Sequence, residues 1–190
     1  MLGAAAASPD RAAFGTETSR AGGGAVLRGW PLRPRLTHRT SGAQSVAVIF
    51  VEQSVQTSAS AQRVWEVLTD HESMSRWFPP VKKVTLDPPG REERNGLGAV
   101  RHIQAAGPTV VEEVVEWDAP RRYVYVLLRG APIRDHRGEV SVVETDEGAR
   151  ATWKIQFRPL IPLTGVVLRP FMARLAGELL RRAVKFAEAS

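Results

Sequence analysis

The chain has 190 residues, of which 43% are hydrophobic and 24% are charged, and it contains no cysteine. This length suits one globular domain, since domains cluster at about 100 to 150 residues. Without cysteine the chain forms no disulfide, thiolate nucleophile, cysteine-ligated zinc site or iron–sulfur cluster. No stretch approaches the roughly 18 uninterrupted apolar residues typical of a membrane-spanning helix.

The formal net charge of +6 is unevenly distributed along the chain. Residues 1–45 contain six arginines and two acidic residues, whereas residues 46–190 contain 20 basic and 18 acidic residues. The second part is therefore nearly balanced and has no electrostatic basis for holding a phosphate backbone. We expect no nucleic-acid partner.

Residues 1–45 combine an alanine run, a glycine run and scattered proline and arginine with no sustained apolar period. Such a segment buries too little surface to offset the entropy of ordering it, so we predict a disordered leader. Its arginine and its few acids are typical of an organellar targeting segment. The alternative is that translation starts at a later codon such as Val46 or Val48.

Turn signals such as Asn95-Gly96 and Gly107-Pro108 divide residues 46–190 into short runs rich in β-branched and aromatic residues. The clearest strand covers residues 151–158, where apolar and polar residues alternate strictly. This alternation predicts a sheet with one buried face. Because the connections are short, successive strands form hairpins and the sheet is antiparallel.

Two helical patterns flank these strands. Ser60 is the expected N-cap of a helix through Asp70, and a short second helix follows to Trp77. The longer pattern is C-terminal, where an apolar residue recurs at every fourth position: Val167, Phe171, Leu175, Leu179 and Ala183.

The C-terminal helix is expected to begin near Arg169, because Pro170 belongs in a first turn or else kinks the helix. Its basic residues form a solvated face of the helix; the alternative is transient contact with a membrane surface, without stable insertion. The expected order is strand, two helices, six strands and a long helix, an α+β arrangement. A strongly curved sheet that grips one helix leaves a gap, and this gap predicts a pocket.

Several segments together resemble a known superfamily. They are the helical stretch 64–70 with 77–81, the stretch Glu112 to Tyr123, Gly130 with Arg134-Asp135, and Thr152-Trp153. Over about residues 47–188 the chain resembles the SRPBCC (START-like, helix-grip) proteins, and in particular the polyketide cyclase/dehydrase and lipid-transport family. The resemblance implies a helix-grip fold, in which a curved seven-stranded antiparallel sheet wraps around the C-terminal helix. It also implies a hydrophobic ligand cavity between the two, but no single activity.

Several chemistries lack their motifs. The sequence contains no GxxxxGK[ST], no complete GxGxxG, no GxSxG and no HExxH. The histidines at positions 38, 71, 102 and 136 are far apart and form no pair on one helical turn. We therefore expect neither a metal site nor a cofactor.

Three residues are candidates for acid/base chemistry. His136 shares its strand parity with Val140 and Val142, so it either points into the pocket or is solvated at the rim. Glu112 precedes another glutamate, so one of the two faces inwards, where a cation such as Arg101 would pair with it, or both form solvent-side ion pairs. Tyr125 either reaches a ligand with its hydroxyl or packs as a core aromatic residue.

The predicted ligand-binding set adds aromatic, basic and helical residues to these candidates. It comprises Trp77, Arg101, His102, Glu112, Tyr125, His136, Trp153, Phe171 and Leu175.

The leading hypothesis is a bacterial, cytoplasmic protein, a monomer or homodimer, that binds or transports a hydrophobic small molecule such as a lipid, polyketide or aromatic compound. One alternative is a metal-free polyketide cyclase, aromatase or dehydratase that uses Glu112, Tyr125 and His136. The other is an interaction or stress-response protein. The identity of the ligand does not follow from the sequence.

Overall fold

The computed structural model describes residues 47–189, so the predicted leader at residues 1–45 lies outside the described part of the chain. The predicted order of strand, helices, six strands and long helix is confirmed, with a short 3-10 helix at His71–Ser73 added before the second helix. The elements are β1 (Ile49–Thr57), α1 (Ala61–Thr69), α2 (Met74–Trp77), β2 (Lys83–Leu86), β3 (Val100–Gln104), β4 (Val110–Asp118), β5 (Arg122–Arg129), β6 (Ile133–Thr145), β7 (Gly148–Pro159) and α3 (Gly165–Glu188).

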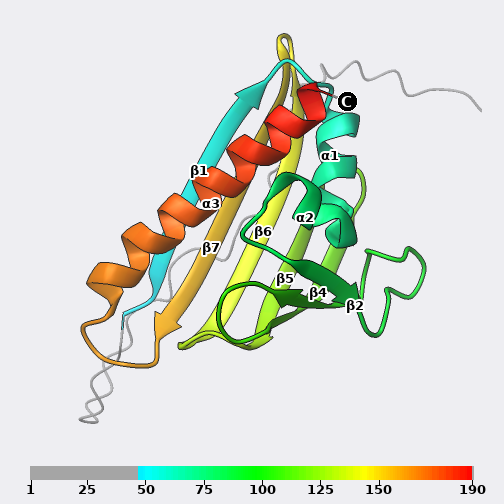
Figure 1. The fold of residues 1–190 in the computed structure, drawn as a ribbon. Coiled ribbons are helices and arrows are strands. Elements are labelled where there is room, and N and C mark those ends of the chain that lie inside the picture. Colours follow the sequence, from blue (N-terminus) through cyan, green and yellow to red (C-terminus); the bar gives the residue numbers. More distant parts are fainter. Residues whose placement is uncertain (1–46, 190) are drawn as a thin grey trace, which may run out of the picture. The chain divides into compact units, whose positions relative to one another are not determined.

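The seven strands form one antiparallel sheet in the order β1-β7-β6-β5-β4-β3-β2, as expected from the short connections. The first strand pairs with the last, and Ile49 lies opposite Phe157. Strand β4 carries two register irregularities against β5, one after Val111 and one after Val114. Such bulges bend a strand and increase its twist, which favours a curved sheet. Figure 1 shows α3 lying across one face of this sheet, beside β1 and β7.

The buried face of the sheet follows the predicted alternation. In β7 the side chains of Ala151, Trp153, Ile155 and Phe157 are buried, while the residues between them are more exposed. The neighbouring strand β6 buries every second residue between positions 136 and 142 on the same face. These two strands therefore present a continuous apolar surface to α3 and α1.

A local side chain caps the start of helix α1. The Ser60 hydroxyl accepts a hydrogen bond from the Arg63 amide at 3.2 Å, which confirms the predicted N-cap. Val64, Trp65 and Leu68 face the core. The 3-10 helix and α2 follow α1 directly, and the chain then enters β2.

The predicted start of the C-terminal helix is wrong by about one turn, because α3 begins at Gly165 and contains Pro170 in its interior. The Thr164 carbonyl accepts hydrogen bonds from the amides of Val167 and Leu168 at 3.1 and 2.9 Å, and so starts the helix before the proline. A Cβ at Gly165 would lie 2.7 Å from Ile49 Cδ1, so the helix enters tightly against β1.

The apolar stripe of α3 is buried only in its second half, contrary to the prediction for its first residues. Leu179, Leu180 and Ala183 are buried, whereas Val167 and Phe171 are 70% and 58% exposed. The first half of α3 is thus less buried than the second: Leu168, Met172 and Leu175 are only partly buried against the core, and Phe171 is exposed. No helix within residues 47–189 is both long enough and apolar enough to cross a membrane.

Candidate functional site

A cavity of about 440 Å³ lies between α3, the segment that leads from α2 into β2, and strands β3 to β7. This volume falls within the roughly 300 to 1,000 Å³ of small-molecule sites. Its apolar lining residues are Met74, Phe78, Pro80, Val81, Ile103, Ala105, Ala106, Val110, Leu127, Ala131, Ile133, Trp153, Ile155, Phe171, Met172, Leu175, Ala176 and Leu179. The remaining lining residues are Arg101, Glu112, Tyr125 and His136, which come from four neighbouring strands.

Arg101 and Glu112 form an ion pair at the wall of this cavity. They are directly opposite each other in the antiparallel pair β3–β4, so their side chains share a face of the sheet. Arg101 Nε donates to Glu112 Oε2 at 2.8 Å, and the two side chains are only 3% and 11% exposed. Burial disfavours the charged guanidinium, but the Glu112 carboxylate together with the Tyr123 and Tyr125 side chains outweighs it and raises the pKa of Arg101 above its ordinary value.

His71 completes this buried polar group from the opposite side. Arg101 Nη1 donates to His71 Nδ1 at 3.2 Å, and the imidazole packs against the Tyr123 ring with centroids 5.5 Å apart. Burial, reinforced by the positive charge of Arg101, lowers the pKa of His71 well below its ordinary value. His71 is therefore a neutral acceptor that fixes the guanidinium, a role that the sequence analysis missed.

Tyr125 lies between Arg101 and Trp153. The Arg101 guanidinium carbon is 4.2 Å from the Tyr125 ring centroid, and Trp153 Nε1 donates to the Tyr125 hydroxyl at 2.8 Å. Gly138, directly opposite in β6, makes room for this ring, because a Cβ there would overlap it. Burial, and then the nearby Glu112 carboxylate, raise the pKa of Tyr125 well above its ordinary value, so the hydroxyl keeps its proton.

His136 is buried rather than solvated at the rim, with only 7% of its surface exposed. Its ring lies 5.4 Å from the Tyr125 ring, and its Nδ1 atom is buried without a hydrogen-bond partner. Burial lowers the pKa of His136, although the Glu112 carboxylate acts in the opposite direction. The imidazole is thus uncharged near neutral pH and lines the cavity.

The structure brings most of the predicted ligand-binding residues together, but two of them lie elsewhere. The residues that line the cavity are Arg101, Glu112, Tyr125, His136, Trp153, Phe171 and Leu175. Trp77 is buried but does not line the cavity. His102 follows Arg101 and so faces the other side of β3, where its Nε2 atom is 3.2 Å from the Asp87 carbonyl oxygen.

The sequence analysis missed most of the aliphatic wall of the cavity. The sequence analysis assigned no inward face to the strand residues Ile103, Leu127 and Ile133. It placed Leu179 in the apolar stripe of the C-terminal helix, which also passes Met172, and interpreted this stripe only as helix packing. Alternating apolar residues were the available signal, but alternation does not separate a cavity wall from a filled core.

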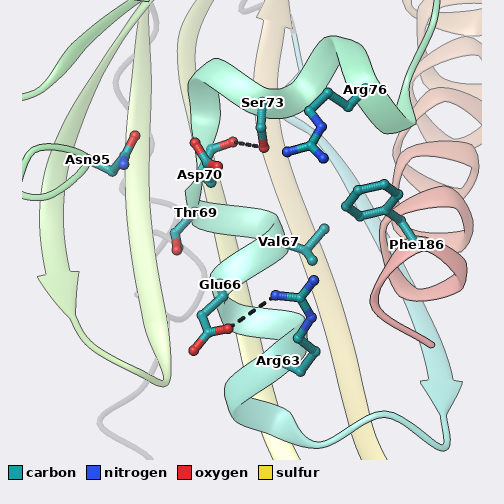
Figure 2. A pocket seen from close by; sticks show the side chains of 9 residues that line it. All are labelled: Arg63, Glu66, Val67, Thr69, Asp70, Ser73, Arg76, Asn95 and Phe186. Carbon is teal, nitrogen blue, oxygen red and sulfur yellow. Dashed lines mark hydrogen bonds and ion pairs between the residues drawn. The ribbon is translucent and has the colours of Figure 1, made fainter. Parts of the chain in front are cut away.

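A second, shallower cleft of about 340 Å³ lies between α1, α2 and the end of α3 (Figure 2). It is lined mainly by charged and polar side chains, including the Arg63–Glu66 ion pair at 3.3 Å. Arg76 lies over the Phe186 ring at 5.7 Å. The paired charges here are solvent-exposed, so the enclosed apolar cavity is the stronger candidate for a ligand site. Within the described residues no three histidine, aspartate or glutamate side chains cluster in a way that could hold a metal ion.

A family model described as "Polyketide cyclase / dehydrase and lipid transport" matches residues 49–187. The chain belongs to this family. The match covers all the described strands and nearly all of α3, so the family assignment applies to the whole unit that contains the cavity. No curated protein matches the sequence.

Solved structures of this family's fold are similar in shape at low sequence identity. A START superfamily protein from Mycobacterium smegmatis has a TM-score of 0.65 at 14% identity, covering 74% of this chain and 97% of its own. Ara h 8.0201 has a TM-score of 0.61 at 14% identity, covering 76% and 100%. Norcoclaurine synthase from Thalictrum flavum has a TM-score of 0.60 at 14% identity, covering 76% and 97%. These likenesses establish the helix-grip fold of Bet v1 and START-like proteins.

The buried ion pair generates a stability prediction. Glu112→Gln leaves the Arg101 cation buried without a counter-charge, so we expect the free energy of unfolding to fall by about 3 to 5 kcal/mol. Urea denaturation followed by far-ultraviolet circular dichroism measures this change. Glu66→Gln is the matched control, because it breaks an exposed ion pair that is worth less than about 1 kcal/mol. Equal, small losses in the two variants would contradict the buried pair.

The lowered pKa of His71 generates a pH prediction. Above about pH 6.5 the imidazole is neutral in both states, but below it the unfolded chain takes up a proton that the folded protein resists. The free energy of unfolding should therefore fall as the pH drops from 6.5. His71→Gln keeps an acceptor for Arg101 and should remove the His71 part of this slope in urea titrations, leaving the smaller part that comes from the lowered pKa of His136. His102→Gln, outside the buried group, should keep the slope. An unchanged slope in His71→Gln would refute the assignment.

Proposed function

We propose that this protein binds a hydrophobic small molecule, such as a lipid, polyketide or aromatic compound, in the cavity under α3, and acts as its carrier or sensor. The observation that carries the proposal is a partly open cavity of about 440 Å³ with a mainly apolar lining. An apolar cavity of this size is costly to leave empty, since its lining forgoes contacts that a ligand would supply. The family includes lipid transport in its description, which agrees with this function.

The first half of α3 provides a route for ligand exchange. Phe171 is 58% exposed and yet lines the cavity together with Met172 and Leu175. Because Phe171 is exposed and Met172 and Leu175 are only partly buried, movement of this part of the helix would change access to the cavity without unfolding the core at Leu179 and Leu180. A carrier needs such a gate, and its location at the less buried end of α3 supports this function.

An enzymatic function has weaker support from the same geometry. A cyclase or dehydratase would use Glu112, Tyr125 and His136 for proton transfer, but the Glu112 carboxylate is held by Arg101 at 2.8 Å. Norcoclaurine synthase, a protein of similar fold, shows that helix-grip proteins include catalysts. Binding is the function that requires no rearrangement of the buried polar residues. Membrane contact, cytoplasmic location, bacterial origin and the monomeric or homodimeric state stay predictions.

A cavity-filling variant tests the binding function. Ala131 lines the cavity at the turn between β5 and β6, so Ala131→Trp should occupy the space and weaken binding of the neutral apolar dye Nile red at least about tenfold. Fluorescence titration measures the dissociation constant. Ala173→Trp is the matched control, since Ala173 is half-buried on α3 but does not line the cavity.

The two outcomes are distinct. Loss of dye binding in Ala131→Trp with retention in Ala173→Trp supports a ligand in this cavity. Binding that is absent from the unaltered protein, or that is equal in both variants, would overturn the proposed function.

A further inference from the structure

The charged groups at the polar end of the cavity already balance one another. Arg101 pairs with Glu112 at 2.8 Å, its Nη1 atom is engaged by His71 at 3.2 Å, and one face of its guanidinium lies over the Tyr125 ring. The two charges of the group therefore sum to zero. The guanidinium keeps N–H groups that these contacts do not use, but its positive charge is already compensated by Glu112, so an incoming anion gains little net attraction.

Beside this pair, the Tyr125 hydroxyl and the His136 imidazole still have unused hydrogen-bonding capacity. The Tyr125 hydroxyl accepts from Trp153 Nε1, but within residues 47–189 its own O–H has no hydrogen-bond acceptor. His136 has no hydrogen-bond partner at either ring nitrogen among the described residues, although the residue is more than nine-tenths buried. A buried polar atom without a partner costs about 1 to 3 kcal/mol, so the Nδ1 atom of His136, beside a tyrosine hydroxyl that still has a proton to donate, indicates a place for a polar ligand atom.

Tyr125 and His136 are close enough to share one ligand atom. Their ring centroids are 5.4 Å apart, and both line the cavity next to the aliphatic wall formed by β5, β6 and α3. Tyrosine donates one hydrogen bond, and a neutral imidazole donates from one nitrogen and accepts at the other. A carbonyl or hydroxyl oxygen within reach of both side chains would bond the Tyr125 hydroxyl and one ring nitrogen of His136.

A carboxylate in the same place would meet a different environment. It would add a second negative charge beside Glu112 in an apolar cavity, with Arg101 already paired. Neither His71 nor His136 would compensate this charge near neutral pH, because burial lowers the pKa of both residues. An anionic ligand would therefore enter only with a proton or at a large cost.

We propose that the cavity selects uncharged apolar molecules that carry a hydrogen-bonding oxygen, a ketone or ester carbonyl or a hydroxyl, and holds that oxygen between the Tyr125 hydroxyl and the His136 imidazole. This inference rests on the proposed binding function and adds the class of ligand to it. The rest of the ligand packs against the aliphatic wall and carries no charge.

A set of three compounds of nearly equal shape tests the selection in the unaltered full-length protein. They are 2-acetylnaphthalene with a ketone, 2-ethylnaphthalene with no polar atom and 2-naphthoate with a carboxylate. Their dissociation constants at pH 8 are measured by competition with Nile red. We expect the ketone to bind at least about tenfold more tightly than each of the other two, a difference of about 1.4 kcal/mol.

The variant His136→Leu removes one hydrogen-bonding partner and replaces it with an apolar side chain of similar size. It should weaken binding of the ketone about tenfold and leave binding of the ethyl compound within about twofold. The comparison between two ligands in one variant distinguishes a lost hydrogen bond from a damaged fold, which would weaken both.

Failure of this inference differs from failure of the binding function. If the dye and all three compounds fail to bind, the proposed function is wrong. If the dye binds but the naphthoate or the ethyl compound matches the ketone, the cavity binds ligands and the selection for an uncharged oxygen-bearing molecule is overturned.

Discussion

The cavity depends on one packing constraint: α3 buries its apolar face in its second half, whereas its first half touches β1 at Gly165 and then lines the cavity with Phe171, Met172 and Leu175. Beyond Ala176 the side chains of Leu179, Leu180 and Ala183 are buried against β1, β7 and α1. N-terminal to Ala176 the helix covers the cavity, which the side chains of the strands do not fill. Ala176 and Gly177 are small and buried, so the helix can approach the sheet closely at this point, and Ala176 also lines the cavity.

The hollow has consequences for the polar residues on its wall. Arg101 and Glu112 face it from adjacent strands, and an isolated charge there would be strongly disfavoured. Their mutual pairing, with His71 behind and Tyr125 alongside, makes the charged residues compatible with an apolar cavity. The same arrangement leaves the hydroxyl of Tyr125 and the imidazole of His136 as the groups open to a ligand. Packing and electrostatics therefore both support the proposal that the site takes uncharged apolar molecules.

Local patterns predicted the elements well, and long-range geometry accounts for what they missed. Ser60 as a helix cap and the alternation of residues 151–158 are properties of neighbouring residues, and both are confirmed. Joining His71 to Arg101 requires a tertiary contact between residues thirty positions apart, which no spacing rule reports. The start of α3 was misplaced because Pro170 dominated the local pattern, while the Thr164 carbonyl and the contact of Gly165 with β1 decide where the helix begins. Trp77 and His102 show the remaining limit, since residue type alone does not tell which face of a short strand or helix a side chain takes.

A crystal structure determined under xenon pressure would test the existence of the hollow most directly, because xenon enters dry apolar cavities and scatters X-rays strongly. Our account predicts a xenon site between Leu175 of α3 and Trp153 of β7, with the helix still resting on the sheet at Leu180. A structure without xenon there, in which Phe171 and Met172 fold inwards and pack against Trp153, would contradict it.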